Sequence, residues 1–118
     1  MIASLGKRTA TMTLALSLME ERGGRAIFET GCARLAGNYD GDGLSTVVFG
    51  EWAGNSGERW VYSVDIDPAA CAVARELTAG MVVKVVEEDS LVALAGYGSP
   101  IDLLYLDSLD YPYDQLLE

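Results

Sequence analysis

The sequence predicts an α/β fold in which a parallel β-sheet lies between two layers of helices. Short segments rich in β-forming residues alternate with segments whose apolar residues recur at helical spacing, which is typical of strands joined by helical crossovers. The strand segments are apolar almost throughout, as in parallel sheets whose two faces are both covered by helices. The length of 118 residues suits one domain, so we expect residues 1–118 to form a single unit.

The first half of the chain contains one predicted strand between two predicted helices. Apolar residues recur at helical spacing over about residues 9–22, and Gly23-Gly24 would end this N-terminal helix. The apolar run in residues 25–31, RAIFETG, predicts the first strand. Residues 43–54, GLSTVVFGEWAG, carry one apolar stripe and predict the second helix. The polar, glycine-rich stretch between them is interpreted as a loop shaped around a ligand.

The second half continues the alternation with three more strands and two more helices. The strands are expected at residues 60–66, 81–87 and 101–107. Asp67 is a favourable helix cap and Pro68 a favourable first helical residue, so a helix follows them and ends at Gly80. Residues 90–98, SLVALAGYG, predict a short helix before the last strand.

Composition excludes several classes of function. The formal net charge is −10, from 18 acidic and 8 basic residues, so we expect neither a nucleic acid nor an anionic membrane as partner. The chain contains no histidine, which excludes Ser-His-Asp and Cys-His catalysis within it and any histidine-ligated metal. The two cysteines do not suggest a disulfide framework, and no segment is apolar enough over sufficient length to span a bilayer. We therefore expect a cytoplasmic protein.

An acidic residue ends or follows every predicted strand. These residues are Glu29, Asp65, Asp89 and Asp107. Ligands of open parallel sheets bind beyond the carboxyl ends of the strands, so we expect the four side chains to line a common rim. Asp89 or Ser90 also suits a structural role, as the cap of the following helix. Asp65 is harder to explain structurally, because it ends an apolar strand, and a carboxylate there can accept both hydroxyls of a ribose.

The segments IFETG, VYSVDIDP, VEEDS and IDLLYLD, in this order and spacing, resemble the first four motifs of class I S-adenosylmethionine-dependent methyltransferases. The resemblance runs from about Arg25 to Asp110, and the small O-methyltransferases of the catechol type are a good comparison. It implies a Rossmann-like three-layer sandwich with strand order 3-2-1-4, the first half of the class I methyltransferase fold. It also implies S-adenosylmethionine as the cofactor and O-methylation of a small-molecule acceptor.

The resemblance implies roles for residues at matching positions of the cofactor site. Glu29 and the backbone around Gly31 would hold the methionyl end of the cofactor. Asp65 would bind the ribose hydroxyls. Asp89, with Ser90 beside it, would lie at the adenine.

The resemblance places the chemical step near the end of the fourth strand. Asp107 would lie near the reacting methyl group and, in metal-dependent relatives, would be a magnesium or calcium ligand, since hard cations favour carboxylate oxygens. Asp107 and Asp110 are the candidate catalytic residues, as bases where the acceptor must lose a proton.

The sequence departs from the family pattern in two places. The turn after the first strand is compact in the family, but here it is extended over residues 34–42. The chain also ends at Glu118, after four of the seven strands of the family fold. Residues 101–107 would then form a bare, apolar sheet edge, so we expect a homodimer through this edge or a fragment of a longer protein.

Two other functions compete with the methyltransferase. The first is a non-catalytic nucleoside- or cofactor-binding or assembly module that is derived from the same fold. The second is a nicotinamide-binding domain, which would prefer a GxGxxG turn joined tightly to the next helix. The long glycine-rich loop argues against this second alternative.

Overall fold

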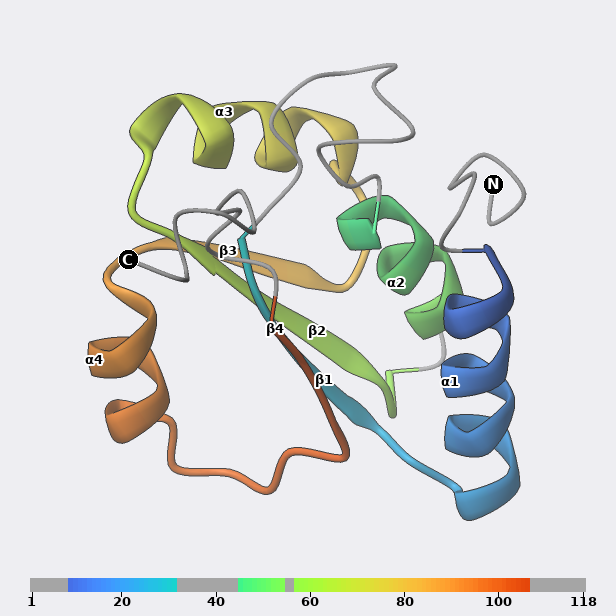
Figure 1. Ribbon diagram of the computed structural model, residues 1–118. Coiled ribbons are helices and arrows are strands. Elements are labelled where there is room, and N and C mark those ends of the chain that lie inside the picture. Colours follow the sequence, from blue (N-terminus) through green and yellow to red (C-terminus); the bar gives the residue numbers. More distant parts are fainter. Residues whose placement is uncertain (1–8, 32–44, 55–56, 107–118) are drawn as a thin grey trace, which may run out of the picture.

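The computed structural model of the chain describes residues 9–31, 45–54 and 57–106. Four strands form one sheet in the order β3-β2-β1-β4, and every neighbouring pair is parallel (Figure 1). The strands are β1 (Ala26–Thr30), β2 (Trp60–Asp65), β3 (Val83–Glu87) and β4 (Leu103–Leu106). The helices are α1 (Thr9–Arg22), α2 (Ser45–Ala53), α3 (Pro68–Leu77) and α4 (Ser90–Gly96). The predicted α/β class and strand order 3-2-1-4 are confirmed.

The later elements are shorter than the sequence pattern predicts. A turn that closes with a 2.9 Å hydrogen bond from Met81 N to Thr78 O delays β3 until Val83. The expected fourth strand begins two residues late, because the Asp102 carboxylate accepts the backbone N–H groups of Arg25 and Ala26 at 2.8 and 3.0 Å. Its side chain thereby replaces a strand partner at the start of β1.

Helices α1, α2 and α3 cover one face of the sheet, and α4 covers the other (Figure 1). Successive side chains of β1 point to opposite faces of the sheet. Ile27 therefore packs under α1 and α2, whereas Phe28 packs under α4. The main core on the α1–α2 face consists of Met12, Met19, Ile27, Val47, Val48, Phe49, Ala53 and Val61. The α4 face has a smaller buried cluster of Phe28, Val64 and Ala93.

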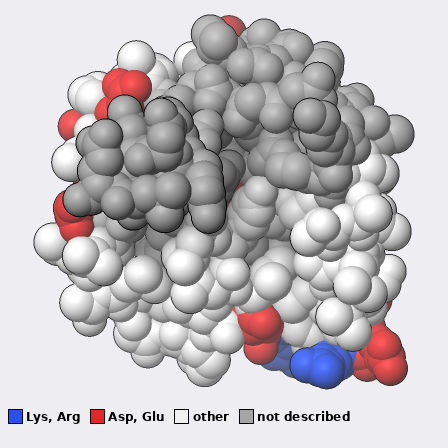
Figure 2. Space-filling model, in the orientation of Figure 1, with Lys and Arg blue, Asp and Glu red and all other residues white. Residues whose placement is uncertain are grey.

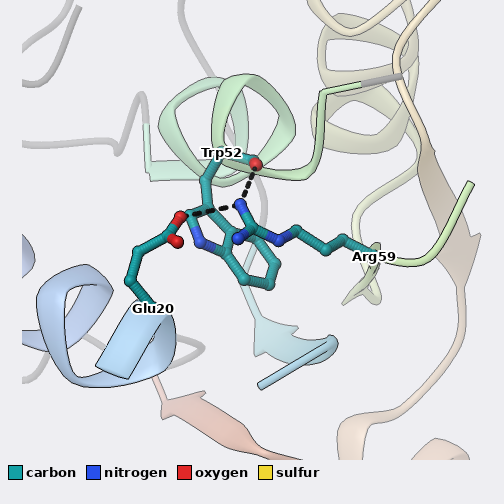
Figure 3. A network of polar contacts seen from close by, with 3 residues as sticks. All are labelled: Glu20, Trp52 and Arg59. Carbon is teal, nitrogen blue, oxygen red and sulfur yellow. Dashed lines mark hydrogen bonds and ion pairs between the residues drawn. The ribbon is translucent and has the colours of Figure 1, made fainter. Parts of the chain in front are cut away.

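A polar cluster of Glu20, Trp52 and Arg59 connects α1 to α2 and to the segment before β2 (Figure 3). Arg59, just before β2, donates from Nη1 to the Trp52 carbonyl of α2 at 3.0 Å and pairs with Glu20 of α1 at 2.8 Å. Its guanidinium carbon lies 4.6 Å from the centroid of the Trp52 ring, in cation–π range. One arginine therefore links two helices and a strand start.

Two expectations concern a membrane and a partner chain. None of the described helices has the length and apolar character that crossing a membrane requires, and the longest of them, α1, has 14 residues. Within the described sheet β4 is an edge strand, but the homodimer expected through it stays a prediction. The cytoplasmic location stays a prediction as well.

Candidate cofactor-binding site

A cavity of about 540 Å³ lies at the carboxyl ends of the strands, on the side of the sheet that α4 covers. Its described lining consists of Thr30, Val64, Asp65, Ile66, Glu88, Asp89, Ser90, Leu91, Leu94, Leu104 and Leu106. All four strands or the residues directly after them contribute. This is the edge at which open parallel sheets bind ligands, and the volume is typical of small-molecule pockets.

Asp65 enters this cavity from the end of a central strand. It is only 5% exposed, and its Oδ1 accepts the backbone N–H of Asp67 at 2.9 Å, which turns the chain into α3. Asp67 then caps α3 by accepting the N–H of Ala69, with Pro68 in the first turn, as the sequence predicts. The thiol of Cys71 lies 3.4 Å from the Asp65 carbonyl oxygen. The backbone that carries the Asp65 carboxylate is therefore held on several sides.

Asp89 and Ser90 reach the same cavity from the start of α4. Asp89 is the N-cap of this helix, and its Oδ1 accepts the backbone N–H groups of Leu91 and Val92 at 2.9 and 3.3 Å. The structural role that the sequence left open between Asp89 and Ser90 thus belongs to Asp89. Its side chain is nevertheless exposed, and it lies on the cavity wall together with the Ser90 side chain.

Glu29 lies apart from the cavity lining, on the α2 face of the sheet. It is fully buried, and its Oε1 accepts hydroxyl hydrogen bonds from Thr46 and, at 2.7 Å, from Ser63. Its Oε2 accepts the hydroxyl of Ser45. Ser63 is its register partner on β2, and the other two residues open α2. The carboxylate therefore joins two strands and the beginning of a helix.

Gly31 ends β1 in a conformation that favours glycine. Its φ is +86°, in the left-handed region where a Cβ is unfavourable. Its N–H donates to the Val64 carbonyl oxygen at 2.7 Å, so the backbone stays attached to β2 after β1 has ended. The end of β1 at Gly31 thus has a local cause.

Of the four carboxylates expected on a common rim, the structure brings Asp65 and Asp89 to one cavity and buries Glu29 beneath α2. Asp107 and Asp110, the proposed catalytic residues, lie outside the described residues. In the described parts of the chain no three His, Cys, Asp or Glu side chains are placed to hold a metal ion. The metal role of Asp107 and both catalytic assignments stay predictions.

The charged side chains of the described cavity lining are all acidic: Asp65, Glu88 and Asp89. Lysine and arginine do not occur in that lining. On the face that Figure 2 shows, the acidic groups of the described residues are scattered, and the basic groups visible there gather at the lower edge between acidic ones. The acidic groups in the cavity lining suit a cationic ligand and would repel a phosphate-bearing one.

The sequence analysis missed two groups of residues that surround the site. Apolar side chains form much of the cavity wall: Val64, Ile66, Leu91, Leu94, Leu104 and Leu106. The hydroxyl group of Ser63 faces Glu29 from within an otherwise apolar strand. A polar residue inside a buried strand is a signal for such a partner, because buried hydroxyls require hydrogen bonds.

Comparison with known proteins assigns the chain to a family. The sequence profile of a family described as a methyltransferase domain matches residues 41–116, more than half of the chain. The chain therefore belongs to this methyltransferase-domain family. Asp65, Asp89 and Ser90 fall inside the matched residues, whereas Glu29 and Gly31 precede them. No curated protein and no solved structure gave a significant match.

Proposed function

We propose that the protein binds S-adenosylmethionine in the cavity at the carboxyl ends of the strands and transfers its methyl group to an oxygen of a small molecule. The observation that carries this proposal is that Asp65 and Ser90 line one cavity of about 540 Å³. Most residues of its lining are apolar, and the charged ones are all acidic. Membership of a methyltransferase-domain family supports it.

The residues of the cavity fit the adenosyl part of this cofactor. The Asp65 carboxylate is acceptor-only when ionised, so it can receive both ribose hydroxyl hydrogens while its Oδ1 also holds the Asp67 N–H. Ile66 and Leu91 offer flat apolar contact for an adenine ring, and Ser90 offers a hydroxyl at its edge. Three acidic groups in the lining complement a ligand with a sulfonium and an ammonium group, and they disfavour NAD or ATP, whose phosphates would be repelled.

S-adenosylmethionine supplies an activated methyl group, so the protein needs to contribute alignment more than covalent chemistry. The described residues contribute binding: Asp65 would hold the ribose, and the leucines around it offer apolar contact. A hydroxyl acceptor would in addition require a base, and Asp107 and Asp110 remain the proposed candidates.

A titration with S-adenosylhomocysteine tests the cofactor site. Asp65→Asn keeps an oxygen for the Asp67 N–H but lacks the charge and one acceptor, so affinity should fall by about 10- to 100-fold, the worth of hydrogen bonds to a charged group. Asp67→Asn is the matched control, since asparagine is an equally good helix cap and this side chain is not in the described cavity lining. Equal affinities for the two variants, or tighter binding of NAD than of S-adenosylhomocysteine, would contradict the proposal.

The reaction itself is tested by incubating the full chain with S-adenosylmethionine and a panel of catechols and other small hydroxylated compounds. Methyl transfer to oxygen that Asp107→Asn reduces would support both the activity and the role of that residue. Binding of S-adenosylhomocysteine without turnover of any acceptor, with or without Mg²⁺, would instead favour a cofactor-binding module.

A further inference from the structure

We propose that Glu29 is a positioning residue that acts on the methionyl end of the cofactor through Ser45 and Thr46, without contacting the cofactor itself. The inference rests on the proposed function together with the family resemblance, which assigns the methionyl end to the backbone around Gly31. It replaces the direct contact that the family resemblance implies for Glu29.

The face of the sheet that Glu29 occupies is the first reason to separate it from the cavity. The side chain is fully buried and is missing from the described cavity lining, although the next residue, Thr30, belongs to that lining. Side chains alternate along a strand, so Thr30 faces the α4 side with the cavity and Glu29 faces α2. The register agrees, because Glu29 lies between Ser63 and Tyr105, and Tyr105 packs against Phe49 of α2.

The hydrogen bonds are the second reason. A carboxylate can only accept, so among the described residues three hydroxyl groups donate to Glu29: Ser45 to Oε2, and Thr46 and Ser63 to Oε1. Charge-assisted bonds of this kind are roughly twice as strong as neutral ones, particularly when buried. Glu29 therefore holds the first turn of α2 against β1 and β2.

The position of Glu29 in the chain makes this attachment relevant to the cofactor. Two residues later Gly31 leaves β1 while still bonded to Val64. Glu29 thus fixes the distance between Gly31 on one side and Ser45 on the other. The family resemblance assigns the methionyl group to the backbone at Gly31, so loosening α2 from Glu29 should disturb this part of the site more than it disturbs Asp65.

The test compares two ligands that differ only at the methionyl end. S-adenosylhomocysteine carries the amino-acid group, and 5′-methylthioadenosine retains the adenosine and thioether without it. Glu29→Gln should weaken S-adenosylhomocysteine about tenfold, the effect of losing one charge-assisted bond, while methylthioadenosine binding changes less than about twofold. Ser45→Ala should produce the same selective loss, whereas Asp65→Asn should weaken both ligands by the same factor.

Each other outcome is informative. Selective loss in Glu29→Gln with no change in Ser45→Ala would mean direct contact and overturn the proposal, as would equal weakening of both ligands. If the unaltered chain binds neither ligand, the proposed function fails and the inference fails with it.

Amide hydrogen exchange gives a readout without ligand. Protection of the amide groups of residues 49–53, which donate within α2, should fall at least about tenfold in the folded Glu29→Gln variant, with β3 unchanged. If Glu29→Gln does not fold, Ser45→Ala decides the question by the same two measurements, and unchanged protection there would overturn the proposal.

Discussion

The two faces of the sheet are built differently. On the α1–α2 face, large side chains such as Ile27 and Phe49 are completely buried in one continuous core. On the α4 face the buried cluster is small, and apolar side chains remain exposed around the cavity, among them Leu91 at 76% and Leu106 at 67%. The first face carries most of the packing, while the second carries the apolar surface that a ligand can contact.

This difference separates stability from ligand binding within a single sheet. Burial of apolar area is the main source of folding free energy, so substitutions on the α1–α2 face should unfold the protein. Exposed apolar side chains near a cavity contribute little to folding but can contribute to binding. The same kind of substitution on the two faces should therefore have different consequences.

The largest expected effect comes from truncating a core aromatic ring. Phe49→Ala removes a fully buried ring that meets Tyr105 edge-on, with centroids 5.5 Å apart. Loss of burial and the resulting cavity should reduce the free energy of unfolding by about 3–5 kcal/mol, measured by urea denaturation. Leu104→Ala, at a side chain that is 45% exposed on the other face, should cost under about 1.5 kcal/mol and chiefly weaken S-adenosylhomocysteine. Equal losses of stability would contradict the contrast between the faces.

A pair of glycines tests the same contrast by adding one methyl group. A Cβ on Gly50 of α2 would lie 2.6 Å from Met81 Sδ and 3.0 Å from Val83 Cγ2, whereas one on Gly96 of α4 would meet nothing within 4 Å. The methionine can turn aside but the strand residue cannot, so Gly50→Ala should cost about 1–2 kcal/mol. Gly96→Ala should be neutral or stabilise by up to about 1 kcal/mol. Thermal melting of both variants measures this, and a stabilised Gly50→Ala would show that the α2 face is looser than described.

The fold was predictable because its signals are local. Gly23-Gly24 and Asp67-Pro68 mark element boundaries by conformational preferences that need no tertiary context, and the apolar strands specify a parallel sheet. The start of β4 was not predictable. It depends on the Asp102 side chain bonding to Arg25 and Ala26, residues far away in sequence.

The site was predictable only in part, because a polar residue near a strand end can line a ligand cavity or bond to a neighbouring helix. Asp65 and Asp89 reach the cavity, as the end-of-strand rule predicts. Glu29 obeys the same rule in sequence, yet it lies one residue before the end of β1 and is buried beneath α2, where Ser45, Thr46 and Ser63 surround it. Its burial follows from strand register and helix placement, which a single sequence does not specify.

Substitutions of Asp89 should have a smaller effect, and they distinguish helix capping from ligand binding on the α4 face. Its Oδ1 accepts two backbone N–H groups of α4, so Asp89→Ala should lower the free energy of unfolding by about 1 kcal/mol. Asp89→Asn preserves the cap and should retain nearly all of the stability. If the side chain also contacts the adenosyl group, both variants should weaken S-adenosylhomocysteine. Unchanged affinity in Asp89→Asn would limit Asp89 to the structural role.

The smallest expected effect concerns Asp102, at the amino edge where the two faces meet. The backbone N–H of Arg25, followed by that of Ala26, lowers the pKa of this carboxyl below its ordinary value of 3.8. A lowered folded-state pKa means a contribution to stability that is complete above the unfolded-state pKa and is lost as pH falls through the folded-state pKa. Between pH 5 and 3 the unaltered protein should therefore lose slightly more stability than Asp102→Asn, whose amide oxygen keeps the bonds without titrating. Because the carboxyl is exposed, the difference should stay below about 1 kcal/mol in urea denaturation at each pH. A larger difference would mean that this edge, and not the α1–α2 core, limits stability in acid.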